Sequence, residues 1–337
     1  MSESADKTRH AAEVAANEAG AMERRRAQSI REPLSPGAYV EYSVDDQPGV
    51  VERARAYLAG APGEPVAPRR AATVMLVSEG KPHYRRFESP LVGGAPIEET
   101  VDAAPVDVFM LRRASTMAFT PDAVVFPGGG MDARDVECAV PWAGPSPEQW
   151  SRLMSCSVPV ARGVITAAAR EVFEESGVLL ASAPDGTAPI DERDDHWAAE
   201  REAVATRQIS FGEFLRERGL VLRSDLMRLR SHWVTPESEA RRYDTYFFLA
   251  RLPKGQHADG RTSEAVEAAW IAPGEALMRF DAGLLKLVPP TISNLTSIVA
   301  ATSVDEAWNT PFDGHVRPHP VARACGEVVL GCEVSET

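Results

Sequence analysis

The residues best suited to do chemistry lie in the string Arg170-Glu-Val-Phe-Glu-Glu-Ser-Gly-Val178. If this string is helical, Glu171 and Glu175 lie one turn apart on the same face, with Glu174 beside them. A different face is apolar and is expected to pack on the core; it carries Ile165, Ala169, Val172 and Ser176. The spacing therefore predicts a helix over Thr166–Ser176 that gathers three carboxylates, with Gly177 as its C-terminal cap.

Three carboxylates within about one turn repel one another, and each such pair costs an exposed helix about 0.2–0.5 kcal/mol. Arg170 is the cation that the local sequence offers against this repulsion. A hard divalent cation would also offset it, because Mg²⁺ prefers carboxylate oxygens and completes its shell with water and substrate phosphates. The alternative interpretation is a solvated acidic face with no ligand.

The string resembles the second half of the Nudix motif, Arg-Glu-hydrophobic-x-Glu-Glu-x-Gly-hydrophobic, with every specified position filled. The first half of that motif requires a glycine, five residues and an acid, then seven residues before the arginine. Gly129 and Asp135 have the required spacing, with Asp where the family prefers Glu. Thirty-four residues rather than seven then precede Arg170, which implies an insert of 27. Without a gap, the glycine and the acid would be Cys156 and Arg162, so the interrupted motif fits better.

The interruption narrows the resemblance to one branch of the family. Phe126–Asp135 is similar to the coenzyme A diphosphatase group, and the split motif resembles the long-insert branch that hydrolyses acyl-CoA. The His and Gly-Gln of the bacterial coenzyme A signature are absent from Ser115–Val125. Three further segments resemble that branch, so the resemblance covers residues 71–301: Trp233–Phe248, Glu264–Ala276 and Pro290–Leu295.

The resemblance implies an α+β fold, a Nudix-type α/β/α sandwich with a mixed sheet, helical insertions and an N-terminal extension. It implies Mg²⁺ or Mn²⁺ held by Glu171, Glu175 and Glu174, with Glu174 also counted as catalytic. Arg170 would orient this cluster by salt bridges. The loop at Gly128 and Gly129 would contact substrate.

Other charged residues are less specific. Glu264 is expected to complete the metal shell or to act as the base; a surface position is the alternative. Arg113 follows a predicted strand and would reach a phosphate or form a salt bridge at the sheet edge. Asp244 stands among strand aromatics, which favours burial and pairing with Arg241 or Arg242.

Hydrophobic patterns predict the elements around this site. Residues 1–70 are expected to form an N-terminal extension, partly disordered or a helical arm, with a short helix at 50–59. Residues 71–301 would form the hydrolase domain, with inserts near 136–162 and 184–230, and residues 302–337 a tail without clear period. Strands are predicted at 72–77, 106–111, 178–180, 232–235, 243–252 and 266–271. Helices are predicted at 145–154, at 211–218 with Ser210 as N-cap, at 273–279 and at 291–301.

Composition sets broad limits. With 337 residues, 44% hydrophobic, the chain is long enough to bury a core. Its net charge of −13 argues against nucleic acid as a partner, but a bound cation would still permit an anionic small molecule. None of its four cysteines forms a CxxC pair, so neither a zinc site nor a disulfide framework is expected. No signal peptide or run of 18 apolar residues occurs, which favours the cytoplasm and no membrane partner.

Three functions remain open. The first is hydrolysis of the diphosphate of coenzyme A or acyl-CoA to 3′,5′-ADP and (acyl-)4′-phosphopantetheine. The second is a Nudix hydrolase of another nucleotide, such as an ADP-sugar, a dinucleotide or NADH. The third is a Nudix-fold module that binds a nucleotide without turnover. A homodimer is common in this family and is a further expectation.

Overall fold

The computed structural model describes residues 32–45, 47–60, 64–80, 104–117, 120–187, 195–262 and 265–336. Glu264 and the N-terminal arm up to residue 31 lie outside these ranges. No helix in the described ranges combines the length and the hydrophobicity that a membrane crossing needs.

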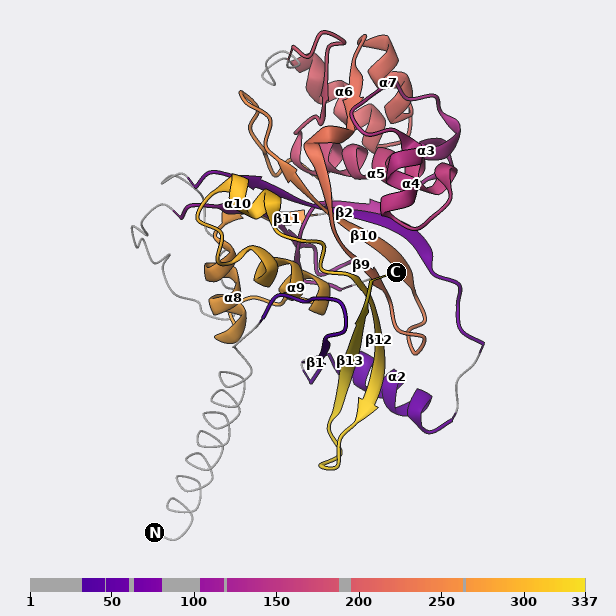
Figure 1. Ribbon diagram of the computed structural model, residues 1–337, viewed down its shortest axis with the longest axis vertical. Helices are drawn as coiled ribbons and strands as arrows, with labels where there is room; N and C mark the ends of the chain where they lie inside the picture. Colours follow the sequence, from indigo (N-terminus) through magenta and orange to yellow (C-terminus); the bar gives the residue numbers. More distant parts are fainter. Residues whose placement is uncertain are drawn as a thin grey trace.

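A ten-stranded mixed sheet forms the centre of the described fold (Figure 1). Its order is β1-β13-β12-β9-β10-β2-β3-β11, with β4 paired to β3 and β5 to β2. The strands are β1 Tyr39–Ser43, β2 Arg69–Ser78, β3 Asp107–Arg113, β4 Val124–Val125, β5 Gly128–Gly130, β9 Met227–Val234, β10 Tyr243–Arg251, β11 Ala265–Ile271, β12 His315–Ala322 and β13 Val328–Ser335. β2 runs parallel to β10 and antiparallel to β3 and β5.

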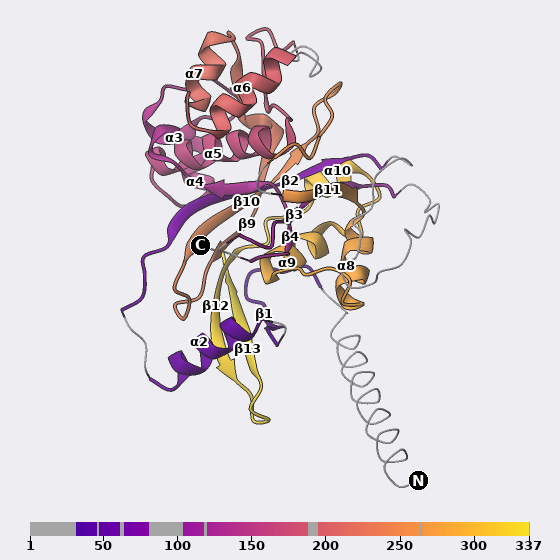
Figure 2. The ribbon, with the colours of Figure 1, turned by 180° about the vertical axis from the view of Figure 1, so that it is seen from behind.

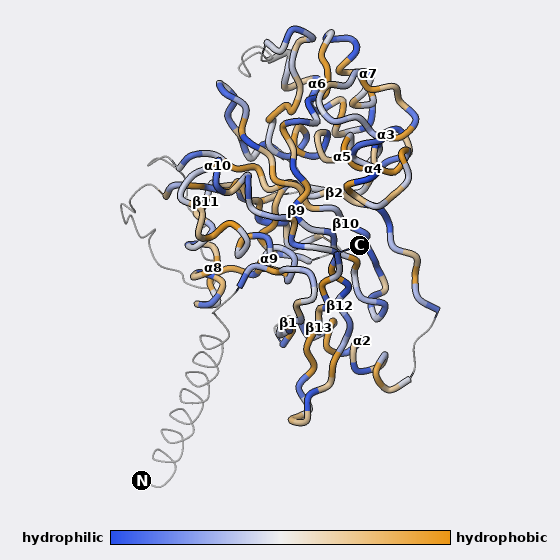
Figure 3. Tube along the Cα trace, in the orientation of Figure 1, coloured by the Kyte–Doolittle hydropathy of each residue, from blue (hydrophilic) through white to orange (hydrophobic). Residues whose placement is uncertain are grey.

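Helices cover both faces of this sheet, which confirms the expected α+β sandwich (Figures 1 and 2). One group is α3 Ala133–Glu137, α4 Pro147–Leu153, α5 Val158–Ser176, α6 Asp195–Ala205 and α7 Phe211–Glu217. The other is α8 Pro273–Asp281, α9 Pro289–Ile298 and α10 Val304–Asn309. In β2, Val74 and Leu76 belong to the core beneath α5, whereas Met75 and Val77 belong to the core beneath α9. Hydrophobic and hydrophilic stretches alternate along most elements, as two-faced elements require (Figure 3).

The central helix α5 begins eight residues earlier than predicted, at Val158 rather than Thr166. The start is favoured by Pro159 in the first turn, where a missing N–H removes no helical hydrogen bond. The predicted core face is confirmed, because Ile165, Ala169 and Val172 are fully buried. Gly177 ends the helix in the left-handed conformation with φ 74°, as predicted.

The two inserted segments contribute structure on the α5 side. Residues 136–162 supply the end of α3, the strand β6 (Trp142–Ala143), α4 and the first turn of α5. Residues 184–230 supply α6, α7, the strand β8 (Val221–Arg223) and a 3₁₀ turn, η1 (Ser224–Leu226). Ser210 caps α7 as predicted, with Glu213 bonding back to it. The strand predicted at 178–180 is wrong: these residues belong to no strand, and the short strand β7 (Ala181–Ser182) follows them.

Both flanking segments add strands to the same sheet. Residues 1–70 were expected to form an extension with one short helix; their described part holds β1 as well as the helix α2 (Pro48–Leu58). The residues after Asn309 were expected to lack a period, but β12 and β13 form a hairpin that pairs with β1 and β9. The bounds of a hydrolase domain at 71–301 stay a prediction. The four cysteines are free thiols, as expected.

Candidate functional site

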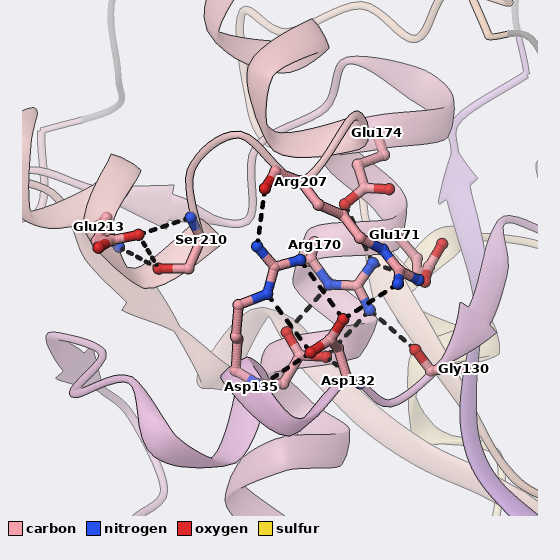
Figure 4. Close-up of polar contacts among 10 residues, drawn as sticks. Gly130, Asp132, Asp135, Arg170, Glu171, Glu174, Arg207, Ser210 and Glu213 are labelled. Carbon is pink, nitrogen blue, oxygen red and sulfur yellow. Dashed lines mark hydrogen bonds and ion pairs between the residues drawn. The ribbon is translucent and has the colours of Figure 1, made fainter.

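Arg170 joins the two halves of the interrupted motif (Figure 4). Its Nε and Nη2 donate to the two carboxylate oxygens of Asp135, each at 3.0 Å. Its Nη1 donates to Glu171 at 2.8 Å and to Glu174 at 3.1 Å, and Nη2 also donates to the carbonyl of Gly130 at 2.9 Å. One guanidinium therefore holds an acid from the first half, two acids from the second and the glycine loop.

The charge on Arg170 is secured by these carboxylates. Burial by itself lowers the pKa of the guanidinium, but the negative charges of Glu171, Asp135 and Glu174 outweigh burial and raise that pKa above its ordinary value. Arg170 is therefore a permanent cation inside the acidic cluster, which confirms the salt bridges expected of it.

The three predicted carboxylates lie together on the C-terminal half of α5. Glu171 and Glu175 are buried, with 8% and 5% of each residue exposed. Glu175 Oε2 accepts a hydrogen bond of 2.9 Å from the backbone N–H of Gly128. The glycine loop therefore contacts two of the residues that the sequence assigned to the site, and Glu174 lies between them on the same helix.

Gly129 is required by close packing against Glu171. A Cβ at this position would lie 2.5 Å from Glu171 Oε1, closer than van der Waals contact permits. Gly130 has open space at the same point, with nothing within 4 Å. The motif glycine is thus needed because the loop backbone lies directly against a candidate ligand.

The acid of the first half is positioned by a capping box that the sequence analysis missed. Asp132 caps α3 by accepting from the backbone N–H of Arg134, and Asp135 Oδ2 accepts from the N–H of Asp132 at 2.8 Å. The signal was present, since two acids three residues apart before a helix are typical of such a box. α3 then packs on α5 at Gly163, where a Cβ would meet Met131 and Val136 at 2.6 Å.

A small pocket opens beside this cluster. It is lined by acids and arginines of α3 and α5 together with residues of the 184–230 insert: Asp132, Arg134, Asp135, Arg170, Glu174, Val204, Arg207, Ile209, Ser210 and Phe211. Charged groups from both halves of the motif therefore share a pocket wall with the insert.

A second arginine, Arg201 of the 184–230 insert, binds the C-terminal end of α5. The sequence did not predict this contact. Arg201 of α6 donates from Nε to the carbonyl of Glu174 at 3.0 Å and from Nη1 to Asp259 at 2.6 Å. The N–H of Asp259 donates to the carbonyl of Ser176 at 2.8 Å. Arg201 thereby satisfies a C-terminal carbonyl of the helix that carries the acids and adds a positive charge at its negative end.

Two predicted site residues remain, Arg113 and Glu264. Arg113 ends β3 opposite Ala265, on the side of the strand shared by Phe109 and Leu111, which pack under α5. At the same sheet edge, Arg112 forms a salt bridge with Glu267 at 2.9 Å. Glu264 lies outside the described residues.

The prediction that Asp244 pairs with Arg241 or Arg242 is wrong. Asp244 is buried as expected, but it contacts Arg70 and His232. The cause is strand register, because β10 and β2 are parallel and place Asp244 beside Arg70. Arg242 instead donates to the carbonyls of Thr235 and Val66.

The donor set suits a hard divalent cation. Glu171, Glu174 and Glu175 offer carboxylate oxygens and no thiolate or imidazole, which favours Mg²⁺ or Mn²⁺ over softer metals. The close cradle at Gly129 holds one of these carboxylates against the loop. Within the described ranges, however, no three acidic, histidine or cysteine side chains converge tightly enough to hold a metal by themselves.

The comparisons agree with this geometry. The family model of the NUDT19 Nudix domain matches residues 147–298. The acyl-coenzyme A diphosphatase NUDT19 of Gallus gallus is 29% identical over 279 residues, which cover 71% of this chain and 70% of that protein. The protein of the same name from Homo sapiens is 28% identical over 273 residues, with 71% and 70% covered.

One solved structure is similar in fold and sequence. The Nudix hydrolase from Alicyclobacillus acidocaldarius is 27% identical with a TM-score of 0.55, covering 74% of this chain and 99% of that one. The range matched by the family model includes Arg170–Val178 but not Gly129–Asp135, so contacts with Arg170, Glu171 and Glu175 are what join the first half to the second. By its completed motif, its fold and these similarities, the chain is therefore similar to Nudix hydrolases of the NUDT19 type.

Proposed function

We propose that this chain hydrolyses the diphosphate of coenzyme A or acyl-CoA, with Mg²⁺ or Mn²⁺, to 3′,5′-ADP and (acyl-)4′-phosphopantetheine. The observation that carries the proposal is the closure of the interrupted motif by Arg170 and Asp135, which lie on either side of the insert. Such an interruption is what links the chain to the acyl-CoA branch. The similarity to two proteins named acyl-coenzyme A diphosphatase supports the same substrate.

Glu171, Glu174 and Glu175 are proposed as metal ligands. A bound divalent cation would neutralise diphosphate oxygens and lower the pKa of an attacking water. The reaction forms one bond from the water oxygen to phosphorus and breaks one bond from phosphorus to the bridging oxygen, which leaves on the second phosphate. The attacking water gives up its two protons to the phosphate products or to solvent.

The protein's own groups would then have separate tasks. Arg170 keeps Glu171 and Glu174 in place, because it donates to both carboxylates while anchored on Asp135. Gly128 and Gly129 let the loop backbone approach the substrate side of the cluster. Glu264 is proposed as the base or an additional ligand and Arg113 as a phosphate contact, both from the sequence. A homodimer and a cytoplasmic location also stay predictions.

A substrate panel tests the proposal. The purified chain is incubated with coenzyme A, acetyl-CoA, a long-chain acyl-CoA, ADP-ribose, diadenosine tetraphosphate and NADH, with Mg²⁺, with Mn²⁺ and with excess chelator. We expect 3′,5′-ADP from the coenzyme A compounds and no product with chelator. Turnover confined to the other nucleotides would reject this substrate, and binding without turnover of any compound would reject the enzyme.

A further inference from the structure

Arg207 follows α6 in a backbone conformation that usually belongs to glycine. Its φ is 61°. Its N–H donates to the carbonyl of Val204 at 2.9 Å, and the N–H of Gln208 donates to the carbonyl of Ala203 at 2.8 Å. This pair of bonds is the Schellman arrangement, in which the left-handed residue is most often glycine because a Cβ costs about 1–2 kcal/mol there. The chain therefore carries an arginine where glycine would fit better.

The side chain of Arg207 lines the pocket beside the acidic cluster, together with Asp132, Asp135 and Glu174. Figure 4 draws its guanidinium next to Asp132, with a dashed line joining the two side chains. The side chain is 71% exposed, and its Nη1 lies 3.6 Å from Asp132 Oδ2. The guanidinium of Arg207 is thus accessible both to solvent and to a ligand in the pocket.

The turn itself is held by backbone contacts. The carbonyl of Arg207 accepts a hydrogen bond of 3.0 Å from Arg134 Nη1, and the capped helix α7 begins just after it. A glycine would keep each of these contacts, since none uses the Arg207 side chain. The loop therefore fixes the position of the Arg207 backbone without any contact of the Arg207 side chain.

The ion pair with Asp132 does not account for an arginine here. A pair of this length with one strongly exposed partner contributes about 0–1 kcal/mol, which is no more than the cost of the left-handed backbone. Asp132 is also already engaged as the cap of α3, through Oδ1 and the N–H of Arg134. On balance, the arginine at this position therefore destabilises the fold. Such strain is expected where a side chain has a role in function.

We infer that Arg207 binds a phosphate oxygen of the substrate, and that the 184–230 insert thereby supplies a substrate-contacting residue to the motif. A guanidinium presents a planar fork that matches two phosphate oxygens, and this one lines the same pocket as Glu174, one of the proposed metal ligands. The inference rests on the proposed function for the identity of the substrate, a diphosphate. It assigns the insert a binding role beyond support of the fold.

The test compares Arg207→Gly, which removes the guanidinium and the backbone cost together, with Arg207→Lys, which keeps a charge but no fork. Ser155→Gly is the matched control, because Ser155 also has a positive φ, of 50°, at the end of α4. Thermal melting should show Arg207→Gly at least as stable as wild type. Its KM for the best diphosphate substrate should rise about tenfold with a smaller change in kcat, Arg207→Lys should be intermediate, and Ser155→Gly should match wild type.

A binding measurement separates this inference from the proposed function. Methylenediphosphonate, a diphosphate that is not hydrolysed, is titrated into each protein with Mg²⁺ by calorimetry. We expect Arg207→Gly to bind it about tenfold more weakly than wild type, whether or not coenzyme A is the substrate. Equal affinity of the two proteins, or no binding by wild type, overturns the inference, and it does so even if the substrate panel succeeds.

Discussion

Arg170 and Asp135 form a two-point ion pair across 34 intervening residues, with both bonds at 3.0 Å. In a motif without an insert the corresponding residues are separated by seven. The pair shows that an insert need not separate the two halves of the motif in space. The extra residues lie between Asp135 and Arg170 in the sequence, and the contact of these two side chains keeps the halves together. The glycine loop and two carboxylates of α5 contact the same guanidinium of Arg170.

Asp135→Asn should separate the charge from the shape of this pair. Both residues are largely buried, and loss of one charge leaves Arg170 with an incomplete set of partners. We expect unfolding free energy to fall by about 3 kcal/mol, as on breaking a buried pair, and kcat to fall at least tenfold. Asp135→Glu keeps the charge and should recover most of the activity. Urea unfolding and steady-state kinetics measure both effects; unchanged kcat in Asp135→Asn would show that the junction does not position the acids.

Gly129→Ala should disturb one carboxylate with little effect on the fold. The added Cβ would meet the Glu171 carboxylate, which can swing away, so stability changes little while Glu171 leaves its place. We expect at least a tenfold loss of kcat with a melting temperature within a few degrees of wild type. Gly130→Ala is the matched control, because that position has open space. Equal activity of the two variants would contradict a role for Glu171 at this position.

Arg201→Ala tests whether the 184–230 insert positions the C-terminal end of α5. It removes the bonds to the carbonyl of Glu174 and to Asp259. We expect kcat to fall about tenfold with little change in KM, because the acids shift while substrate contacts remain. Arg201→Lys should restore part of the loss. Arg218→Ala is the control within the same insert, since Arg218 pairs with Glu200 of α6. A loss equal in both variants would indicate general destabilisation.

The C-terminal hairpin should make stability depend on pH through His315. Its Nδ1 lies 2.6 Å from Nδ1 of His232, so one ring must donate and the other accept. Burial lowers the pKa of His315 to about 4, helped by the charges of His232 and Arg317. Because the folded pKa lies below the unfolded value, the unfolded chain binds more protons at acidic pH; the stability is present above about pH 6.5 and is lost as pH falls towards 4.

The size of this effect is on the order of 3 kcal/mol, from about 1.4 kcal/mol per unit of pKa. His315→Gln should flatten the fall in unfolding free energy between pH 6.5 and 4, measured by urea titration. His319→Gln on the exposed side of the same strand should leave the pH dependence unchanged. An unaltered slope in His315→Gln would show that another group is responsible.

The sequence predicted what depends on local pattern. The core face of α5 and its end at Gly177 follow from helical spacing and a glycine cap, and Ser210 follows from a capping box. The family resemblance added the pairing of Gly129–Asp135 with α5, which spacing alone does not give. What it missed depends on distant contacts: Arg201 meets the end of α5 only through the packing of α6.

Strand register and proline residues explain two other features that could not be predicted from the sequence. The partner of Asp244 is set by the parallel register of β10 and β2, which no local pattern encodes. β12 was missed because Pro318 and Pro320 break a strand pattern. The structure accommodates them because β12 pairs with β9 only at His315 and Val316, so the prolines need not donate on that side.

The most direct test of the central claim is to measure, on one preparation, Mn²⁺ affinity and product release by wild type and by Glu175→Gln. Glu175 is buried and bonded to the glycine loop, so the amide keeps the shape of the side chain and removes its charge. The account predicts at least tenfold weaker Mn²⁺ binding and at least a hundredfold loss of metal-dependent diphosphate hydrolysis, about 2.7 kcal/mol of transition-state stabilisation. Unchanged metal affinity together with unchanged product release in Glu175→Gln would contradict it.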